Sequence, residues 1–282
     1  MRTFSAHAVR GAIILGLTVV CLLVVARPTN AQKAFAPTFT VYLGFDDGPV
    51  PGKTDIILAI LKKYHVHATF FIQGAHIRNN EAYLRRELLD GHHIGNHLVF
   101  HDPVIMVPAT PPDSVLLNRY YQTDGAIRAA LGDLGPIWDA EEPIKPFRWP
   151  GGAIRAFPLP NVITYNWNST TADSREGGVT PIGAAENALY GYPPQHYYGV
   201  YAWGDGAVVL MHDESWSTIH ALSTIIENLQ ANGVAFGVLP RPGDKPGTMP
   251  ISLNDVPRCA RQPGNCKAIY YRYLFSGSLP TS

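Results

Sequence analysis

Apolar and polar positions alternate between strand and helix periods from about residue 38 to residue 100. Short apolar runs rich in β-branched and aromatic residues are separated by segments with apolar residues at helical spacing. The pattern predicts a strand at 39–45, a helix at 54–64, a strand at 68–73, a helix at 81–89 and a short strand at 93–95. Strand, helix and strand joined by short turns predict parallel strands with right-handed crossovers.

The pattern changes between residues 102 and 146, where PATPPD, one helical stretch at 115–131 and the turn-rich GDLGP follow one another. We interpret this stretch as an excursion with one helix near the mouth of the site. Strands are predicted again around 162–167 and 207–211, followed by a helix at 218–230 and a last strand at 234–239. We therefore expect residues 38–245 to form one α/β domain and residues 246–282 to form a C-terminal extension.

The N-terminus has the pattern of a secretory signal peptide. Arg2 and Arg10 precede an uncharged run from Gly11 to Ala26, and Thr29-Asn30-Ala31 offers a small-x-small cleavage site. Because a bilayer span needs about 20 apolar residues, this run is short for a membrane anchor. We expect residues 1–31 to be removed and the protein to be exported without a stable membrane span. If cleavage fails, the protein stays anchored to the membrane.

Composition and charge limit the classes of molecule that the protein can bind. Removal of 1–31 takes away three arginines and no acid, which leaves 19 basic and 22 acidic residues. No basic field attracts nucleic acid, so we expect a neutral substrate or one bound by shape. Cys259 and Cys266 are an even pair in an exported chain and predict a disulfide, which closes a loop of about eight residues. Two free thiols are the alternative.

Candidate metal ligands lie in two short motifs. Asp46 and Asp47 follow the first strand directly, where the loops of parallel α/β folds build sites. His97 and His101 are four residues apart, and a helical turn places such a pair on one face. One aspartate and two histidines leave positions open for water and substrate, which is typical of a catalytic metal site. Zn²⁺ is the default ion for this set, and Co²⁺ or Fe²⁺ also fits.

Two more residues complete a hydrolytic set. Arg148 stands before Trp149, Pro150 and Gly151, and a guanidinium beside a carboxylate fixes its orientation. His212 ends an apolar run, where an imidazole can donate a proton near neutral pH.

Together these motifs resemble the polysaccharide deacetylases with the NodB-homology domain, carbohydrate esterase family 4. The resemblance covers roughly residues 40–239 and includes GFDDGP, GNHLVFH, FRWPGG and LMHD, with the spacers between them. It implies a distorted (β/α) barrel of about seven units. It implies that Asp46 is the general base, that Asp47, His97 and His101 bind a divalent metal, and that His212 is the general acid. Arg148 would orient Asp46, the Gly151 N–H would bind the oxyanion, and Leu210 would line the acetyl pocket.

The chain departs from the family pattern around the substrate. Leu98 follows the first histidine ligand where the family has Ser or Thr, and Gly151 stands where the family often has Tyr. The family's Asp-x-x-Asp-Trp becomes Thr170, Asp173 and Ser174. In this reading Asp173 still pairs with Arg148, and the aromatic residue is lost.

The resemblance predicts removal of N-acetyl groups from an acetylated polysaccharide or oligosaccharide such as chitin, peptidoglycan or poly-N-acetylglucosamine. Three alternatives remain: an O-acetyl esterase of xylan-like polymers, a catalytically idle glycan-binding domain and an amidase of small molecules. The aromatic stretch 190–203 either stacks on sugar rings or packs on itself.

Overall fold

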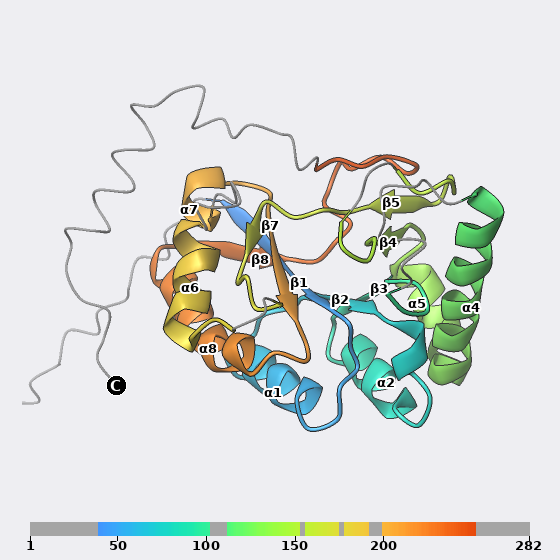
Figure 1. Cartoon of the computed structure of the whole chain (residues 1–282), viewed down its shortest axis with the longest axis horizontal. Helices are drawn as coiled ribbons and strands as arrows, with labels where there is room; N and C mark the ends of the chain where they lie inside the picture. Colours follow the sequence, from blue (N-terminus) through green and yellow to red (C-terminus); the bar gives the residue numbers. More distant parts are fainter. Residues whose placement is uncertain (1–38, 102–111, 153–155, 175–177, 192–198, 252–282) are drawn as a thin grey trace, which may run out of the picture. The chain divides into compact units, whose positions relative to one another are not determined.

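The structure is a computed structural model of the chain and describes residues 39–101, 112–152, 156–174, 178–191 and 199–251. Within these ranges the chain forms one parallel sheet covered by helices, a curled and open (β/α) barrel (Figure 1). The predicted distorted barrel is thereby confirmed. The predicted signal segment and the Cys259–Cys266 pair lie outside the described residues.

The sheet has β1 near its middle. Seven strands follow in the order β5-β4-β3-β2-β1-β7-β6, and β8 pairs with the start of β1. Their bounds are β1 Thr40–Asp46, β2 Thr69–Ile72, β3 His93–Asn96, β4 Lys145–Phe147, β5 Val162–Thr164, β6 Ser169–Thr170, β7 Ala207–His212 and β8 Ala235–Gly237. Each of these strand pairs is parallel. The carboxyl ends of the strands therefore gather at one edge of the barrel, where a parallel fold places its site.

Alternation along β1 and β7 divides their side chains between two buried layers. Val41, Leu43 and Phe45 pack with the helices, and the odd-numbered residues of β7 do the same. Tyr42, Val208 and Leu210 belong to a second cluster on the opposite, concave face. Because the side-chain period of a strand is two, Asp46 and His212 continue this concave face at the ends of their strands. The two-residue period of the strands therefore fixes where both polar side chains point.

Helices cover the convex face. They are α1 Thr54–Tyr64, α2 Glu81–Leu89, α4 Asp113–Leu131, α5 Gly135–Glu141, α6 Pro181–Tyr190, α7 Val200–Trp203 and α8 Trp216–Ala231, with 3₁₀ turns η1 Gly74–His76 and η2 Gly132–Leu134. Helix α8 packs against α1 and α6, and α2 packs against α4. Among the described helices, none is long and apolar enough to span a membrane.

Several predicted elements need correction. The excursion 102–146 was predicted to hold one helix, but its described part holds α4, η2 and α5 and ends in β4. The prediction missed β4 because it is only three residues long and contains Pro146. It also missed α6, whose start follows the N-cap Thr180. The first strand extends one residue further than predicted and includes Asp46.

The described part of the aromatic stretch packs inside the protein. The rings of Tyr190 and Tyr201 lie 5.7 Å apart, and both residues join the cluster beneath the helices. This favours the alternative in which the aromatic residues pack on themselves. Residues 192–198 lie outside the described ranges.

Candidate active site

The ends of β1 and β7 bring Asp46 and His212 together. The two residues are partners in the strand register, and both side chains are almost completely buried. Asp47 follows with a φ of 71°, a left-handed conformation that turns the chain out of the strand direction. The Nδ1–H of His76 in η1 donates to the Asp47 carbonyl over 2.6 Å. This turn lets two consecutive aspartates face different neighbours.

His97 and His101 lie in the loop after β3 and not on a helical turn. The predicted helical turn is therefore wrong. Leu98 between them has a φ of 60°, and its N–H donates to Asn96 Oδ1 over 2.9 Å. The amide group of Asn96 also donates to the Tyr120 carbonyl in α4 over 3.1 Å. The side chain of Leu98 is buried with Phe147 and Trp149, so it supports the loop by packing.

Three side-chain atoms converge on one point. Asp47 Oδ1 lies 2.9 Å from His101 Nε2 and 3.5 Å from His97 Nε2, and the two imidazole nitrogens are 3.4 Å apart. Ligands about 2.0–2.1 Å from a tetrahedral metal lie roughly 3.3 Å from one another. Although His101 Nε2 lies close to the buried Asp47 Oδ1, none of the described residues makes a well-aligned hydrogen bond to this oxygen. This trio therefore fits a divalent cation.

Two of the three side chains favour the protonation states that a cation needs, whereas the contact with Asp47 raises the pKa of His101, which must lose its proton when an ion binds. Burial lowers the pKa of His97, which favours neutral imidazole. Its Nδ1–H donates to the Arg148 carbonyl over 2.7 Å, which leaves the Nε2 lone pair facing the trio. Burial raises the pKa of Asp47, but His101 and His97 outweigh burial and hold that pKa below its usual range. A carboxylate and a neutral imidazole are the ligand forms that metals need.

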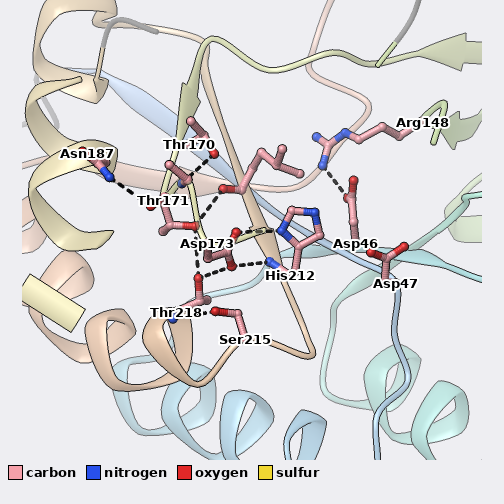
Figure 2. Close-up of polar contacts among 12 residues, drawn as sticks. Asp46, Asp47, Arg148, Thr170, Thr171, Asp173, Asn187, His212, Ser215 and Thr218 are labelled. Atoms are coloured by element: carbon pink, nitrogen blue, oxygen red, sulfur yellow. Dashed lines mark hydrogen bonds and ion pairs between the residues drawn. The ribbon is translucent and has the colours of Figure 1, made fainter. Parts of the chain in front are cut away.

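Arg148 holds Asp46. Its Nη1 donates to Asp46 Oδ1 over 2.7 Å (Figure 2), and its Nε donates to the Tyr165 carbonyl over 3.2 Å. The guanidinium lies 4.0 Å from the Phe71 ring centroid and is fully buried. Gly44 makes room for it, because a Cβ there would lie 2.7 Å from Nη1. Asp46 is thus fixed by a charged partner on the concave face.

Asp173 contacts His212 and not Arg148. Its Oδ1 accepts from His212 Nδ1 over 2.7 Å, and its Oδ2 accepts from the His212 backbone N–H over 3.0 Å (Figure 2). The predicted Asp173–Arg148 pair is therefore wrong, because both oxygens of Asp173 contact His212 and Arg148 contacts Asp46 instead. Burial alone would lower the pKa of His212, but the contact with Asp173 outweighs it and raises that pKa to about 9. His212 is therefore protonated near neutral pH and can donate a proton.

Comparison with known proteins identifies the family of the chain. The sequence profile of the family described as polysaccharide deacetylase matches residues 34–159. An uncharacterized 30.6 kDa protein of Geobacillus stearothermophilus is 39% identical over 201 residues, which are 70% of this chain and 68% of the relative. The chain belongs to the polysaccharide deacetylase family. Membership makes it a hydrolase of the deacetylase class.

Other similar proteins are named deacetylases or an acetyl esterase. The chitooligosaccharide deacetylase of Bradyrhizobium sp. (strain ANU 289) is 29% identical and matches 72% of this chain and 90% of its own length. The peptidoglycan-N-acetylglucosamine deacetylase of Listeria monocytogenes is also 29% identical, but the match spans 37% of that protein. A solved family 4 acetyl xylan esterase from Clostridium thermocellum, in complex with a cobalt ion, has 25% identity and a TM-score of 0.54, over 71% of this chain and 88% of that one.

The predicted substrate contacts and the departures from the family pattern lie at or near the carboxyl ends of the strands. Gly151 follows β4 in a left-handed conformation with a φ of 74°. Leu210 lies on the concave face of β7 beside Gly44 in the register. Thr170 accepts a hydrogen bond from the Ala172 N–H, and Ser174 is exposed. Sequence reasoning missed Asn96, His76 and Thr218, which support the site through hydrogen bonds.

Proposed function

We propose that this chain is a divalent-metal-dependent deacetylase that hydrolyses N-acetyl groups of an amino-sugar glycan of the chitin, peptidoglycan or poly-N-acetylglucosamine type. One observation carries the proposal. A carboxylate held by arginine and an imidazole held by a second carboxylate flank a trio of side chains whose spacing fits a divalent cation. Amide hydrolysis needs all three groups, because water must be deprotonated, the acyl oxygen stabilised and the amine protonated.

Asp47, His97 and His101 would hold the cation. A divalent ion there would polarise the acyl oxygen and lower the pKa of water. Zinc is our first choice on ligand type, and cobalt is the second because the Clostridium thermocellum relative was solved with it.

The chain's own residues then move the protons. Asp46 accepts a proton from the attacking water, and Arg148 keeps its carboxylate in place. The Gly151 N–H donates a hydrogen bond to the developing oxyanion, and Leu210 contacts the acetyl methyl group. His212, protonated while Asp173 holds its other nitrogen, gives its proton to the departing nitrogen. Acetate and a free amine leave.

The protonated imidazole favours an amide substrate over an ester. An amine is a poor leaving group until it is protonated, whereas an alcohol needs less assistance. A pKa of about 9 keeps His212 charged near neutral pH. An acetyl xylan esterase among the related structures supports O-acetyl hydrolysis as the second candidate. The ordered acid, base and ligand set argues against an idle binding domain.

We also propose export. The support is the pattern of residues 1–31, with Arg2 and Arg10 before the uncharged run and a small-x-small motif at its end. N-terminal sequencing of the protein recovered outside the cytoplasm should begin at Gln32. An intact Met1 terminus on membrane-bound protein would contradict cleavage.

Acetate release from a substrate panel tests the function. The panel contains chitin oligomers, peptidoglycan, poly-N-acetylglucosamine and acetylxylan, each with added Zn²⁺ or Co²⁺. We expect release from at least one of the first three, at a rate above that on acetylxylan. Release from acetylxylan alone would favour the esterase, and no release from any of them would favour the binding domain.

A further inference from the structure

We propose that Thr218 of α8 is a positioning residue for the general acid, because its hydroxyl fixes the Asp173 carboxylate that orients His212. This inference rests on the proposed function, in which His212 protonates the leaving nitrogen. No motif that predicted the site contains Thr218, and it lies on a different element from the acid and its partner.

The Asp173 carboxylate is held from two sides. On one side both of its oxygens contact His212, at Nδ1 and at the backbone N–H. On the other side the Thr218 hydroxyl donates to Asp173 Oδ2 over 2.5 Å (Figure 2). Three donors on one buried carboxylate favour its charged form and hold its plane. Without the hydroxyl, Oδ2 would keep only the backbone contact, and the carboxylate could rotate away from Nδ1.

Thr218 is itself firmly placed. It is fully buried in the first turn of α8, and its N–H donates to the hydroxyl of the N-cap residue Ser215 over 3.3 Å. Its hydroxyl oxygen lies 3.0 Å from the Thr171 hydroxyl. The Thr171 carbonyl in turn accepts from the Asn187 amide of α6 over 3.2 Å. Two helices therefore determine where the hydroxyl points, as Figure 2 shows.

The start of α8 adds an electrostatic contribution. The first turn of a helix carries partial positive charge and favours a nearby anion. Asp173 accepts its hydrogen bond from a side chain in this turn, and the pKa of Asp173 is held below its usual range by His212 and Thr218 although burial raises it. The charged carboxylate then holds the imidazole in the tautomer and orientation needed to donate from Nε2.

The dependence of the rate on the leaving group distinguishes a role in positioning the acid from a general effect on stability. An N-acetyl substrate needs a proton on its leaving nitrogen, whereas p-nitrophenolate leaves without one. We would measure kcat and KM on chitotetraose and on p-nitrophenyl acetate with Zn²⁺-loaded full chain. Thr218→Ser and Thr218→Ala differ only by the hydroxyl, and Thr218→Val keeps the shape of threonine. Thr123→Val is the matched control, because Thr123 is a buried threonine of α4 whose hydroxyl has no hydrogen-bond partner among the described residues.

The ratio of kcat on chitotetraose to kcat on p-nitrophenyl acetate should fall about tenfold in Thr218→Ala and Thr218→Val, with KM for chitotetraose unchanged. It should return to within about twofold of wild type in Thr218→Ser and stay unchanged in Thr123→Val. Equal losses on both substrates, or no loss in either variant, would overturn the positioning role while leaving the deacetylase proposal intact. A wild type that acts on p-nitrophenyl acetate but not on chitotetraose would contradict the deacetylase proposal, and the inference with it.

Discussion

Asp46 and His212 are register partners at the ends of adjacent parallel strands, β1 and β7. Each has a charged partner of its own, Arg148 for the carboxylate and Asp173 for the imidazole. The proposed base and acid are therefore built on rigid strands, and their partners come from segments further along the chain. Each partner offers a separate substitution that disturbs one proton transfer and leaves the other in place.

Loss of one imidazole should empty the metal site. His97→Ala removes one of the three converging ligand atoms, and two ligands bind a divalent cation much more weakly. We expect metal affinity to fall by at least about 100-fold, since even contacts that only support a ligand are worth about 10–100-fold. Metal content after dialysis, measured by mass spectrometry, checks this. His220→Ala, at an exposed histidine of α8, is the control. Unchanged metal content in His97→Ala would remove His97 from the ligand set.

Asp173→Asn should move the alkaline limb of the pH profile. His212 must be protonated to donate, so kcat falls as pH rises through its pKa. Asp173 raises that pKa to about 9 against the effect of burial. The neutral asparagine removes the largest contribution that opposes burial and leaves the smaller ones of Asp46 and Asp47, so the limb should shift to lower pH by about one unit or more. A bound cation lowers the pKa in both proteins and leaves the difference. An unshifted limb in kcat measured between about pH 5.5 and 9.5 would contradict the assignment.

Gly44→Ala should displace the guanidinium group of Arg148. The new Cβ would lie 2.7 Å from Nη1 and 2.9 Å from Nη2, so the guanidinium must shift from Asp46. We expect kcat to fall by about tenfold or more while metal content stays the same. Gly125→Ala in α4 meets no atom within 4 Å and should stabilise the fold by about 0.5–1 kcal/mol. Wild-type kcat in Gly44→Ala would show that the Arg148–Asp46 contact is dispensable.

Glu87 is a buried carboxyl group outside the site that lowers the stability of the fold. It is fully buried on α2, and its carboxyl oxygens have no hydrogen-bond partner among the described residues. Burial, with Asp213 nearby, raises its pKa well above the ordinary value. The folded state holds a proton that the unfolded chain releases above about pH 4.3, so the free energy of unfolding falls as pH rises beyond that value.

Glu87→Met removes this cost and keeps a similar volume. We expect a gain in the free energy of unfolding at both pH values, measured by urea denaturation, and the gain at pH 7 should exceed the gain at pH 4 by about 1–3 kcal/mol. Glu186→Met on the exposed face of α6 should give no pH-dependent gain. Equal gains for Glu87→Met at both pH values would mean that ionisation of Glu87 has no part in stability.

The sequence predicted those parts of the fold that depend on local pattern. The continuous apolar runs of β1 and β7 mark buried strands, and the acids after β1 mark the edge where the site lies. The bend between His97 and His101 was beyond local reasoning, because the side chain of Asn96 and the packing of Leu98 produce it. The same spacing read locally gave a helical turn.

Partners distant in sequence were the other limit. Asp173 is nearer to Arg148 than to His212 along the chain, and only the strand order decides that it joins the imidazole. Thr218 carried no signal, since a threonine in the first turn of a helix is common. Contacts of this kind depend on tertiary packing, which a single sequence does not reveal.

Separation of metal binding from turnover in Asp46→Asn tests the central claim most directly. The amide cannot accept a proton from water, yet it keeps the size of the carboxylate and lies outside the Asp47, His97 and His101 trio. Metal content and acetate release from a chitin oligomer should be measured on the same Zn²⁺-loaded samples of wild type and variant. We predict equal metal content and a fall in acetate release of at least about 100-fold. Full activity in Asp46→Asn, with the metal still bound, would contradict the account.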